Sequence, residues 1–374
     1  MLETEVLIIG GGPAGSTLAR TLIQAGSKVV VMDKATFPRD KICAGWVTPA
    51  VMQELAIDPE DYAHDHVLQP IFGFRTGQLE GDLVQSDFQG KPVSYGIRRF
   101  EFDHYLLQRC GAELMLGQTV SSMQRVDKTW IINDAIKARL VIGAGGHFCP
   151  VARFIGAKKP RETAVLAQEI EFKLSPQQKV DCPVNGEVPE LFFTADLKGY
   201  GWVFRKGDYL NVGLGREDKH KLSAHVEHFC NHLVKIGRIP GNLPGKLKGH
   251  AYLLYPRARR TPVQDGVLLI GDAAGLAYSQ SGEGIRPAVE SALLAAQVIL
   301  DCRGDYSIDR LYRYQKELEK RFGPRRPARN RGLRIPPQLR QFLARILMKN
   351  RWFVENILIR RWFLHEQDKP LLTR

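Results

Sequence analysis

The sequence predicts an α/β fold in which a parallel-sheet domain is interrupted by a second lobe of mixed sheet and followed by a basic helical segment. Two apolar strands that run directly into glycine-rich turns, within residues 5–15 and 267–284, predict the parallel-sheet domain. Residues 160–262 contain short strand-like segments separated by Gly and Pro, which predict the second lobe. A chain of 374 residues, 44% hydrophobic and 25% charged, is typical of a globular protein with a substantial core.

The basic charge is concentrated near the C-terminal end. Residues 320–374 contain fifteen Lys and Arg against three acids, so they account for +12 of the formal net charge of +13. The six cysteines include no C-x-x-C pair, which favours free thiols in a reducing compartment. We find neither a signal peptide nor the run of about 18 apolar residues that a membrane span needs, and we therefore expect a cytoplasmic protein.

The first glycine-rich turn lies inside a βαβ pattern. Residues 5–9 are expected to form a buried strand, 17–25 a helix and 28–32 a second strand, which Asp33 closes. The turn carries the pattern Gly-x-Gly-x-x-Gly. Its first glycine allows a tight turn, the second lets a pyrophosphate approach the backbone, and the third lets the helix pack closely on the strand.

An acid at the end of the second strand completes a Rossmann-like dinucleotide site. Asp33 lies 23 residues after Gly10, where a carboxylate accepts hydrogen bonds from the adenosine ribose. The helix N-terminus offers free N–H groups and partial positive charge to the phosphates. The candidate binding residues of this unit are Gly10, Gly12, Pro13, Ala14, Gly15, Asp33 and Lys34.

The second glycine-rich turn indicates which dinucleotide binds, FAD or NAD. Residues 267–270 form a buried strand, and Gly282-Glu283-Gly284-Ile285 opens a long amphipathic helix. This segment resembles the second fingerprint of flavoproteins with the p-hydroxybenzoate hydroxylase-type fold, although Ser279 stands where these proteins usually have Pro. The resemblance implies FAD, with the Asp of the turn at the ribityl chain and the helix N-terminus at the flavin pyrimidine edge, where it stabilises the negative charge of reduced flavin. The implied binding residues are Gly271, Asp272, Gly282, Gly284 and Ile285.

Two further stretches resemble the same flavoproteins. Residues 97–107 resemble their R-x-x-F-D element, which implies that Arg99 approaches the cofactor; a surface arginine that caps a helix is the alternative. Residues 140–153 resemble their D-G-x-x-S-x-x-R element, but Gly145 replaces the Asp that helps to hold NADPH in hydroxylases of this group. The chain has no second strand–glycine–helix unit for a nicotinamide nucleotide. The electron donor therefore stays open between transiently bound NAD(P)H and a reduced protein carrier.

Two more stretches indicate a branch of these flavoproteins. Residues 37–49 resemble the K-x-C-G loop of geranylgeranyl reductases, which lies beside the flavin, with Lys41, Cys43 and Ala44 at the motif positions. Residues 199–215 resemble their Y-x-W-x-F-P motif, with Arg205 in place of Pro. The chain is therefore similar to the geranylgeranyl reductase family of FAD-dependent oxidoreductases, a group that also includes flavin-dependent halogenases.

The aromatic residues of this last motif alternate along an expected strand. Tyr200, Trp202 and Phe204 would share one face, where they would line an apolar pocket over the flavin. Ordinary sheet core is the alternative, and for Cys43 the alternative is a small buried loop residue. The resemblance implies that reduced flavin delivers hydride to a C=C bond of an isoprenoid or prenyl lipid. The candidate catalytic residues are Cys43, Tyr200 and Trp202, and the proton donor stays open among Cys43, Tyr200 and water.

Two other functions stay open. A flavin-dependent monooxygenase or halogenase would act on an aromatic or other apolar small molecule, and residues 199–205 keep two positions of the halogenase motif G-W-x-W-x-I-P, Gly199 and Trp202. A flavin module that binds or senses without turnover is the third possibility. No metal site is expected, because the three histidines that share a helical face in residues 225–232 are interpreted as solvated.

These observations predict three parts. The FAD-binding domain is expected over 1–65, 97–159 and 263–303, the substrate lobe over 66–96 and 160–262, and the basic helical segment over 304–374.

The basic segment interleaves Arg and Lys with Leu, Ile, Phe and Trp over residues 324–374. This pattern suits the anionic inner face of a cell membrane, so we expect peripheral contact there; nucleic acid is a less favoured partner, and packing on the enzyme body is the alternative.

Overall fold

The computed structural model describes residues 1–159, 162–218, 221–325 and 336–371. Its first sheet has the strand order β17-β18-β11-β1-β2-β8, with β10 beside β11 and β9 beside β10. The strands are β1 (Leu2–Ile9), β2 (Val29–Asp33), β8 (Glu113–Leu116), β9 (Met123–Val126), β10 (Thr129–Ile132), β11 (Ile136–Gly143), β17 (Val263–Gln264) and β18 (Val267–Leu269). From β18 to β8 these strands run parallel, so their carboxyl ends lie at one edge of the sheet.

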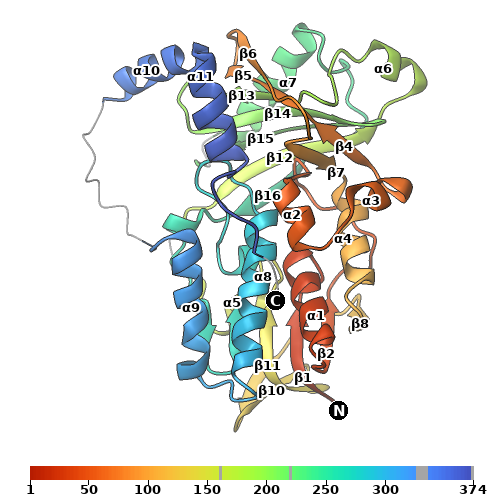
Figure 1. Ribbon diagram of the computed structural model, residues 1–374, viewed down its shortest axis with the longest axis vertical. Helices are drawn as coiled ribbons and strands as arrows, with labels where there is room; N and C mark the ends of the chain where they lie inside the picture. The colour runs from red at the N-terminus through yellow and green to blue at the C-terminus, as the bar shows by residue number, and fades with distance from the viewer. Residues whose placement is uncertain (160–161, 219–220, 326–335, 372–374) are drawn as a thin grey trace.

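Apolar strands and helices build the core of this sheet. Val6, Leu7 and Ile8 are fully buried, as expected for a parallel strand that is covered on both faces. Three helices stand side by side in front of the strands in Figure 1. These helices are α1 (Pro13–Gln24), α8 (Ile285–Asp301) and α9 (Ile308–Phe322). Because α1 follows β1 and α8 follows β18, both helices begin at the carboxyl edge of the sheet, where dinucleotides bind in such folds.

A second sheet of seven strands has the order β16-β12-β15-β14-β13-β5-β6. Its strands are β5 (Gly73–Gln78), β6 (Leu83–Asp87), β12 (Val165–Lys173), β13 (Glu190–Phe193), β14 (Gly199–Lys206), β15 (Tyr209–Arg216) and β16 (Lys248–Tyr252). Alternation along β14 divides its side chains between two faces. Val203 packs with Phe229 of α7 (Leu222–Lys235), whereas Trp202 and Phe204 lie in a different apolar cluster on the opposite face.

Smaller elements connect the two sheets. A three-stranded sheet has the order β3-β7-β4. The connecting elements are β3 (Trp46–Val47), α2 (Pro49–Glu54), α3 (Pro59–Asp65), β4 (Leu68–Ile71), β7 (Ser94–Ile97), α4 (Arg99–Gln108), α5 (Pro150–Phe154), α6 (Pro176–Asp181), η1 (Tyr255–Arg257) and η2 (Gly271–Ala273).

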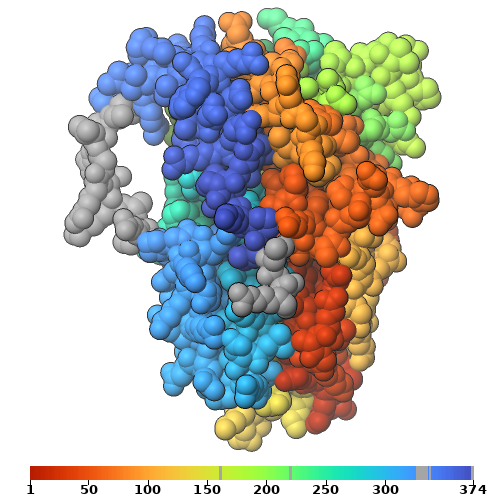
Figure 2. All heavy atoms as spheres, viewed as in Figure 1, coloured from red at the N-terminus to blue at the C-terminus, as the bar shows by residue number. Residues whose placement is uncertain are grey.

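The C-terminal segment, expected as basic and helical over 304–374, forms helices that pack on two different sheets. Helix α9 packs on the first sheet, while α10 (Pro337–Lys349), α11 (Arg351–Phe353) and the π-helical η3 (Val354–Phe363) lie against the second. Figure 2 shows these last elements, in blue, beside the orange segment that contains β5 and β6. The first part of the expected membrane-binding stretch, residues 326–335, lies outside the described residues.

The apolar residues of η3 face the protein. Val354, Leu358, Ile359 and Phe363 are buried in the same apolar cluster as Trp202. This part of the tail therefore follows the alternative of packing on the enzyme body. None of the described helices combines the length and apolar character that crossing a membrane requires.

Candidate functional site

A large cleft lies where the carboxyl edge of the first sheet meets the second sheet. It is lined by both glycine-rich turns, residues 39–46 and aromatic side chains of β14 and β16. All but two of the predicted cofactor-binding and catalytic residues line it. These residues are Gly10, Gly12, Pro13, Ala14, Asp33, Lys34, Lys41, Cys43, Ala44, Arg99, Tyr200, Trp202, Asp272, Gly282, Gly284 and Ile285.

The two predicted residues outside the lining shape the turns. A Cβ atom on Gly15 would overlap the carbonyl oxygen of Gly10, so a glycine is needed where α1 packs on the strand end. Gly271 has a φ of +57°, a left-handed backbone that favours glycine. In contrast, a Cβ on Gly12 would make ordinary contacts, 3.5 Å from Arg39 Nη2 and 4.0 Å from Asp103 Oδ2, and Gly12 lines the cleft.

Asp33 ties the end of β2 to the first glycine turn. Its Oδ2 accepts a hydrogen bond from the Gly11 N–H (2.7 Å), and its Oδ1 accepts one from the Ala35 N–H (2.9 Å). A carboxylate oxygen can accept more than one hydrogen bond, so Asp33 retains capacity for a ribose hydroxyl in the cleft.

Two guanidinium groups share one buried carboxylate beside Gly12. Arg99 donates two hydrogen bonds to Asp103, at 2.6 and 2.8 Å, and Arg39 lies 3.2 Å from the same carboxylate. Burial lowers the pKa of Arg99, but the ion pair with Asp103 outweighs it and raises the pKa, so the guanidinium stays charged. One carboxylate cannot neutralise two cations, and the excess positive charge suits a pyrophosphate. The sequence reasoning missed Arg39, although this arginine lies in the same loop as Lys41.

A second set of polar side chains comes from the Lys41 loop, β16 and η2. Lys41 Nζ donates to the ring of His250 at 3.1 Å, and His250 Nε2 lies 3.9 Å from Asp272 Oδ2. Burial and, next, Arg99 lower the pKa of Lys41 to about 8. Burial and Lys41 lower the pKa of His250 to about 2, so the imidazole is neutral and accepts from the ammonium group. No sequence motif indicated His250.

The aromatic wall of the cleft is held by hydrogen bonds. The Tyr200 hydroxyl donates to the Ser281 carbonyl oxygen, and Trp202 Nε1 donates to Asn211 Oδ1 at 2.7 Å. Burial raises the pKa of Tyr200 well above its usual range, so this phenol stays protonated. Phe204 differs from the expectation, because it packs at 5.1 Å from the Trp46 ring and is absent from the cleft lining. For Phe204, therefore, the alternative of ordinary sheet core is the better description.

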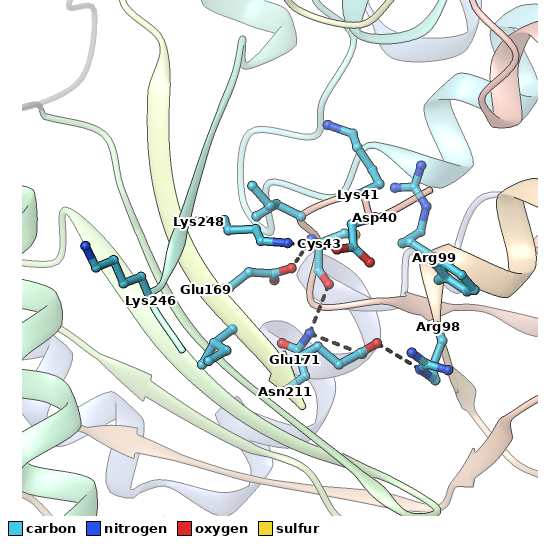
Figure 3. A pocket seen from close by; sticks show the side chains of 13 residues that line it. Asp40, Lys41, Cys43, Arg98, Arg99, Glu169, Glu171, Asn211, Lys246 and Lys248 are labelled. Atoms are coloured by element: carbon cyan, nitrogen blue, oxygen red, sulfur yellow. Dashed lines mark hydrogen bonds and ion pairs between the residues drawn. The ribbon is translucent and has the colours of Figure 1, made fainter. Parts of the chain in front are cut away.

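The Cys43 loop is attached to the second sheet. Its backbone N–H donates to Glu169 Oε1 at 2.5 Å, and its carbonyl oxygen accepts from Asn211 Nδ2 at 3.3 Å, as Figure 3 shows. The loop thus lies between the cleft and a smaller cavity on its other side. The sequence reasoning did not identify Glu169, which lines both spaces.

The arrangement fits an extended dinucleotide with a flavin. Gly12 lines the cleft together with Arg39 and Arg99, and Asp33 lies at the end of the next strand. At the other end of the cleft, a Cβ on Gly284 would lie 3.2 Å from Asp272 Oδ1 and would crowd this carboxylate. Gly284 and Ile285, at the N-terminus of α8, line the cleft.

Comparisons with known proteins agree with this geometry. Residues 3–56 match the family model described as an FAD binding domain. Digeranylgeranylglycerophospholipid reductase 2 of Methanosphaera stadtmanae is 27% identical over 348 residues, which cover 86% of this chain and 85% of that protein. Menaquinone reductase of Mycobacterium tuberculosis is 30% identical over 321 residues, with 80% of this chain and 77% of that protein covered. The chain belongs to the geranylgeranyl reductase family.

Solved structures place this geranylgeranyl reductase-family enzyme in the expected fold. A geranylgeranyl bacteriochlorophyll reductase-like protein from Thermoplasma acidophilum superimposes with a TM-score of 0.73 at 22% identity, covering 100% of this chain and 94% of that chain. A flavin-dependent halogenase shares the fold, with a TM-score of 0.66 at 22% identity over 86% of this chain and 63% of that chain. The predicted fold class, the FAD cofactor and the assignment as an FAD-dependent oxidoreductase are thus confirmed.

Proposed function

We propose that this enzyme reduces C=C bonds in the isoprenoid chain of a prenyl lipid, with hydride from reduced FAD. The observation that carries the proposal is the aromatic wall of Tyr200, Trp202 and Tyr252, which lines the same cleft as the turn before α8. An apolar chain can lie on this wall, while the turn holds the flavin edge. Two of the family members are named for reductions of digeranylgeranylglycerophospholipid and menaquinone, which supports a substrate of this class.

The residues of the cleft divide the work of holding the cofactor. Gly12, Asp33, Arg39 and Arg99 would hold the adenosine and pyrophosphate end. Asp272 would meet the ribityl chain, and the N–H groups of 284–285 would face the pyrimidine edge of the ring. When bound, FAD supplies the hydride.

The protein must compensate for an unreactive substrate. An isolated alkene is a poor hydride acceptor, so alignment of the acceptor carbon and exclusion of water provide much of the rate. Tyr200 and Trp202 are fixed by hydrogen bonds, which lets them serve as rigid contacts for the isoprenoid. NAD(P)H or a reduced protein carrier would then return two electrons to the flavin.

Helix α10 supports peripheral contact with a membrane that holds such a substrate. Its exposed apolar side chains include Phe342 (58% exposed) and Ile346 (53%), and Arg340, Arg345 and Lys349 are exposed on the same short helix. Aromatic and aliphatic side chains among basic residues bind an anionic bilayer surface, where each cation contributes about 1 kcal/mol. We therefore propose that the enzyme works in the cytoplasm at the inner face of the cell membrane, a partner that the apolar side chains of α10 favour over nucleic acid.

Anaerobic photoreduction tests the proposed reaction. The flavin of the purified enzyme is reduced by light, and prenyl lipids are added without oxygen. Reoxidation of the flavin together with loss of a C=C bond, detected by mass spectrometry, is the expected result. A product that forms only with oxygen would instead support a monooxygenase or halogenase, and failure of every acceptor would support a module without turnover.

A further inference from the structure

Glu169 lies in the wall between the cleft and a second cavity. The second cavity is lined largely by charged side chains, and Figure 3 shows Glu169 between these side chains and the Cys43 loop. Strand pairing sets Glu169 of β12 opposite Gly213 of β15 and Lys248 of β16. A Cβ on Gly213 would lie 2.7 Å from the Glu169 Cβ, so this glycine leaves room for the carboxyl group beside the Trp202 ring.

Only one of the two oxygen atoms of the Glu169 carboxyl group has a hydrogen-bond donor among the described residues. Oε1 accepts the Cys43 N–H at 2.5 Å, whereas Oε2 is buried and has no hydrogen-bond partner among the described residues. The residue is 5% exposed. A buried carboxylate oxygen without a donor is costly, and this cost favours the protonated acid.

Glu171, the second carboxyl group on β12, favours the ionised form, unlike Glu169. Glu171 accepts from Lys206 at 2.8 Å and from Arg98 at 3.1 Å, and these cations, against the effect of burial, lower the pKa of Glu171. Burial raises the pKa of Glu169 to about 7, even though the Cys43 N–H and Lys206 favour its ionised form. Two carboxyl groups with pKa values on opposite sides of the usual range suggest different tasks.

The charged and titratable groups around Glu169 come from every neighbouring element. They are Glu171 of β12, Lys206 of β14, Lys248 and His250 of β16, Arg99 of α4, and Lys41 and Cys43 of the loop. Lys248 is engaged with Asp40 (2.8 Å), and Arg99 with Asp103. Lys248 and Arg99 are thus paired with carboxylates other than Glu169.

We propose that Glu169 passes a proton from the outer cavity into the cleft during reduction of the substrate. This inference rests on the proposed function. As the π bond breaks, one carbon receives hydride from reduced flavin and the other receives a proton from the Cys43 thiol or a cleft water. The Glu169 carboxyl proton replaces the one that was given, and water in the outer cavity reprotonates the carboxylate. Two electrons leave the flavin, two C–H bonds form, and Glu169 returns to its starting state. Glu169 does not touch the substrate in this scheme; it supplies the proton to the Cys43 thiol or to the cleft water, which then protonates the substrate carbon.

Single-turnover kinetics test the proposal. The photoreduced holoenzyme is mixed with a prenyl lipid at a series of pH values, and flavin reoxidation is followed. For the wild type, the rate should fall as the pH rises through about 7, because the protonated acid is required. Glu169→Gln should bind FAD with unchanged stoichiometry but react about 10²- to 10⁴-fold more slowly, without this pH dependence. Glu169→Asp should restore the pH dependence at a reduced rate.

A control and an independent measurement separate a proton role from a structural one. Glu171→Gln removes a carboxylate from the same cavity and two ion pairs, and it should keep a rate that falls with rising pH, with the midpoint moved to lower pH because Glu171 raises the pKa of Glu169. Infrared spectra of the holoenzyme should contain the carbonyl stretch of a protonated carboxyl group that titrates near pH 7 and is absent from Glu169→Gln.

The outcomes separate this proposal from the proposed function. If Glu169→Gln reacts like the wild type at every pH, or if the wild type lacks the infrared band, the role of Glu169 is wrong and the reductase function stands. If no prenyl lipid reoxidises the wild-type flavin, the reductase function itself is wrong, and the role of Glu169 falls with it.

Discussion

Arg286 and Glu290, one turn apart on α8, form an ion pair of 2.8 Å in which both side chains are buried. Arg286 also donates to the carbonyl oxygens of His365 and Asp368, and Arg321 of α9 donates to Glu290 at 3.0 Å. The pair therefore joins the C-terminal residues to the helix whose N-terminus faces the cleft. These contacts with α9 and the C-terminal residues hold α8 in place beside the cleft.

The first prediction concerns this pair. Arg286→Met should lower the free energy of unfolding by about 3–5 kcal/mol, because Glu290 would remain buried with less compensation. Denaturant unfolding of the holoenzyme measures this change. Arg310→Met is the matched control, since its pair with Asp305 is exposed (61% and 63%) and 3.8 Å long, and such pairs contribute about 0–1 kcal/mol. Equal effects of the two variants would contradict the prediction.

The second prediction concerns the first glycine turn. Gly12→Val should give colourless protein, because a branched side chain would fill the space where the pyrophosphate approaches the backbone. The absorbance of flavin relative to protein measures the loss. Gly241→Val places the same side chain in an exposed loop where a Cβ has its nearest neighbour at 3.9 Å, and this variant should stay yellow. Yellow Gly12→Val protein would refute the assignment.

The third prediction concerns the charge of Lys41. Burial lowers the pKa of Lys41 from 10.5 to about 8, so the folded protein holds this proton less tightly than the unfolded chain. In protein stripped of FAD, Lys41→Met should raise the free energy of unfolding below pH 8 by roughly 2–4 kcal/mol, since a tenfold change in proton affinity corresponds to about 1.4 kcal/mol. The gain should shrink as the pH rises from 8 toward 10.5, where both states become neutral.

Chemical unfolding of the wild type and Lys41→Met at pH 7, 9 and 10.5 checks this dependence. Lys34→Met removes an exposed lysine beside the same cleft and should show no such trend. A gain that is constant with pH would show that packing, rather than charge, is responsible.

The fourth prediction concerns α10. Phe342→Asp combined with Ile346→Asp should release the protein from anionic liposomes, because the apolar contact is lost and negative charge is added. Flotation of the liposomes measures binding, and the flavin content should not change. Val126→Asp combined with Val180→Asp adds the same charge at exposed positions on other elements (45% and 80% exposed) and should leave binding intact. Substitution is preferable to deletion of residues 324–374, which would also remove the buried Val354 and Phe363.

The parts of the site that depend only on residues close together in the sequence could be predicted from sequence patterns. The turn at 10–15 needs glycine for backbone reasons that act over a few residues, and Asp33 follows a strand of unmistakable apolar pattern. The alternation of Tyr200 and Trp202 places them on one face of a strand whatever the rest of the fold. For these reasons, the strand ends and the cleft residues of the two glycine-rich turns could be predicted from the sequence.

Other parts were decided by contacts between distant segments. Arg39, Glu169 and His250 belong to no dinucleotide motif, and only the meeting of a loop with β12 and β16 brings them to the cleft. The pKa of Glu169 depends on burial, which no spacing of residues specifies. By itself, therefore, the sequence determined where backbone turns and alternating faces must occur, because these depend on nearest neighbours along the chain. Only the tertiary structure decided which surface each apolar face meets, as with Phe363 packing inward, because burial is a property of the whole assembled fold.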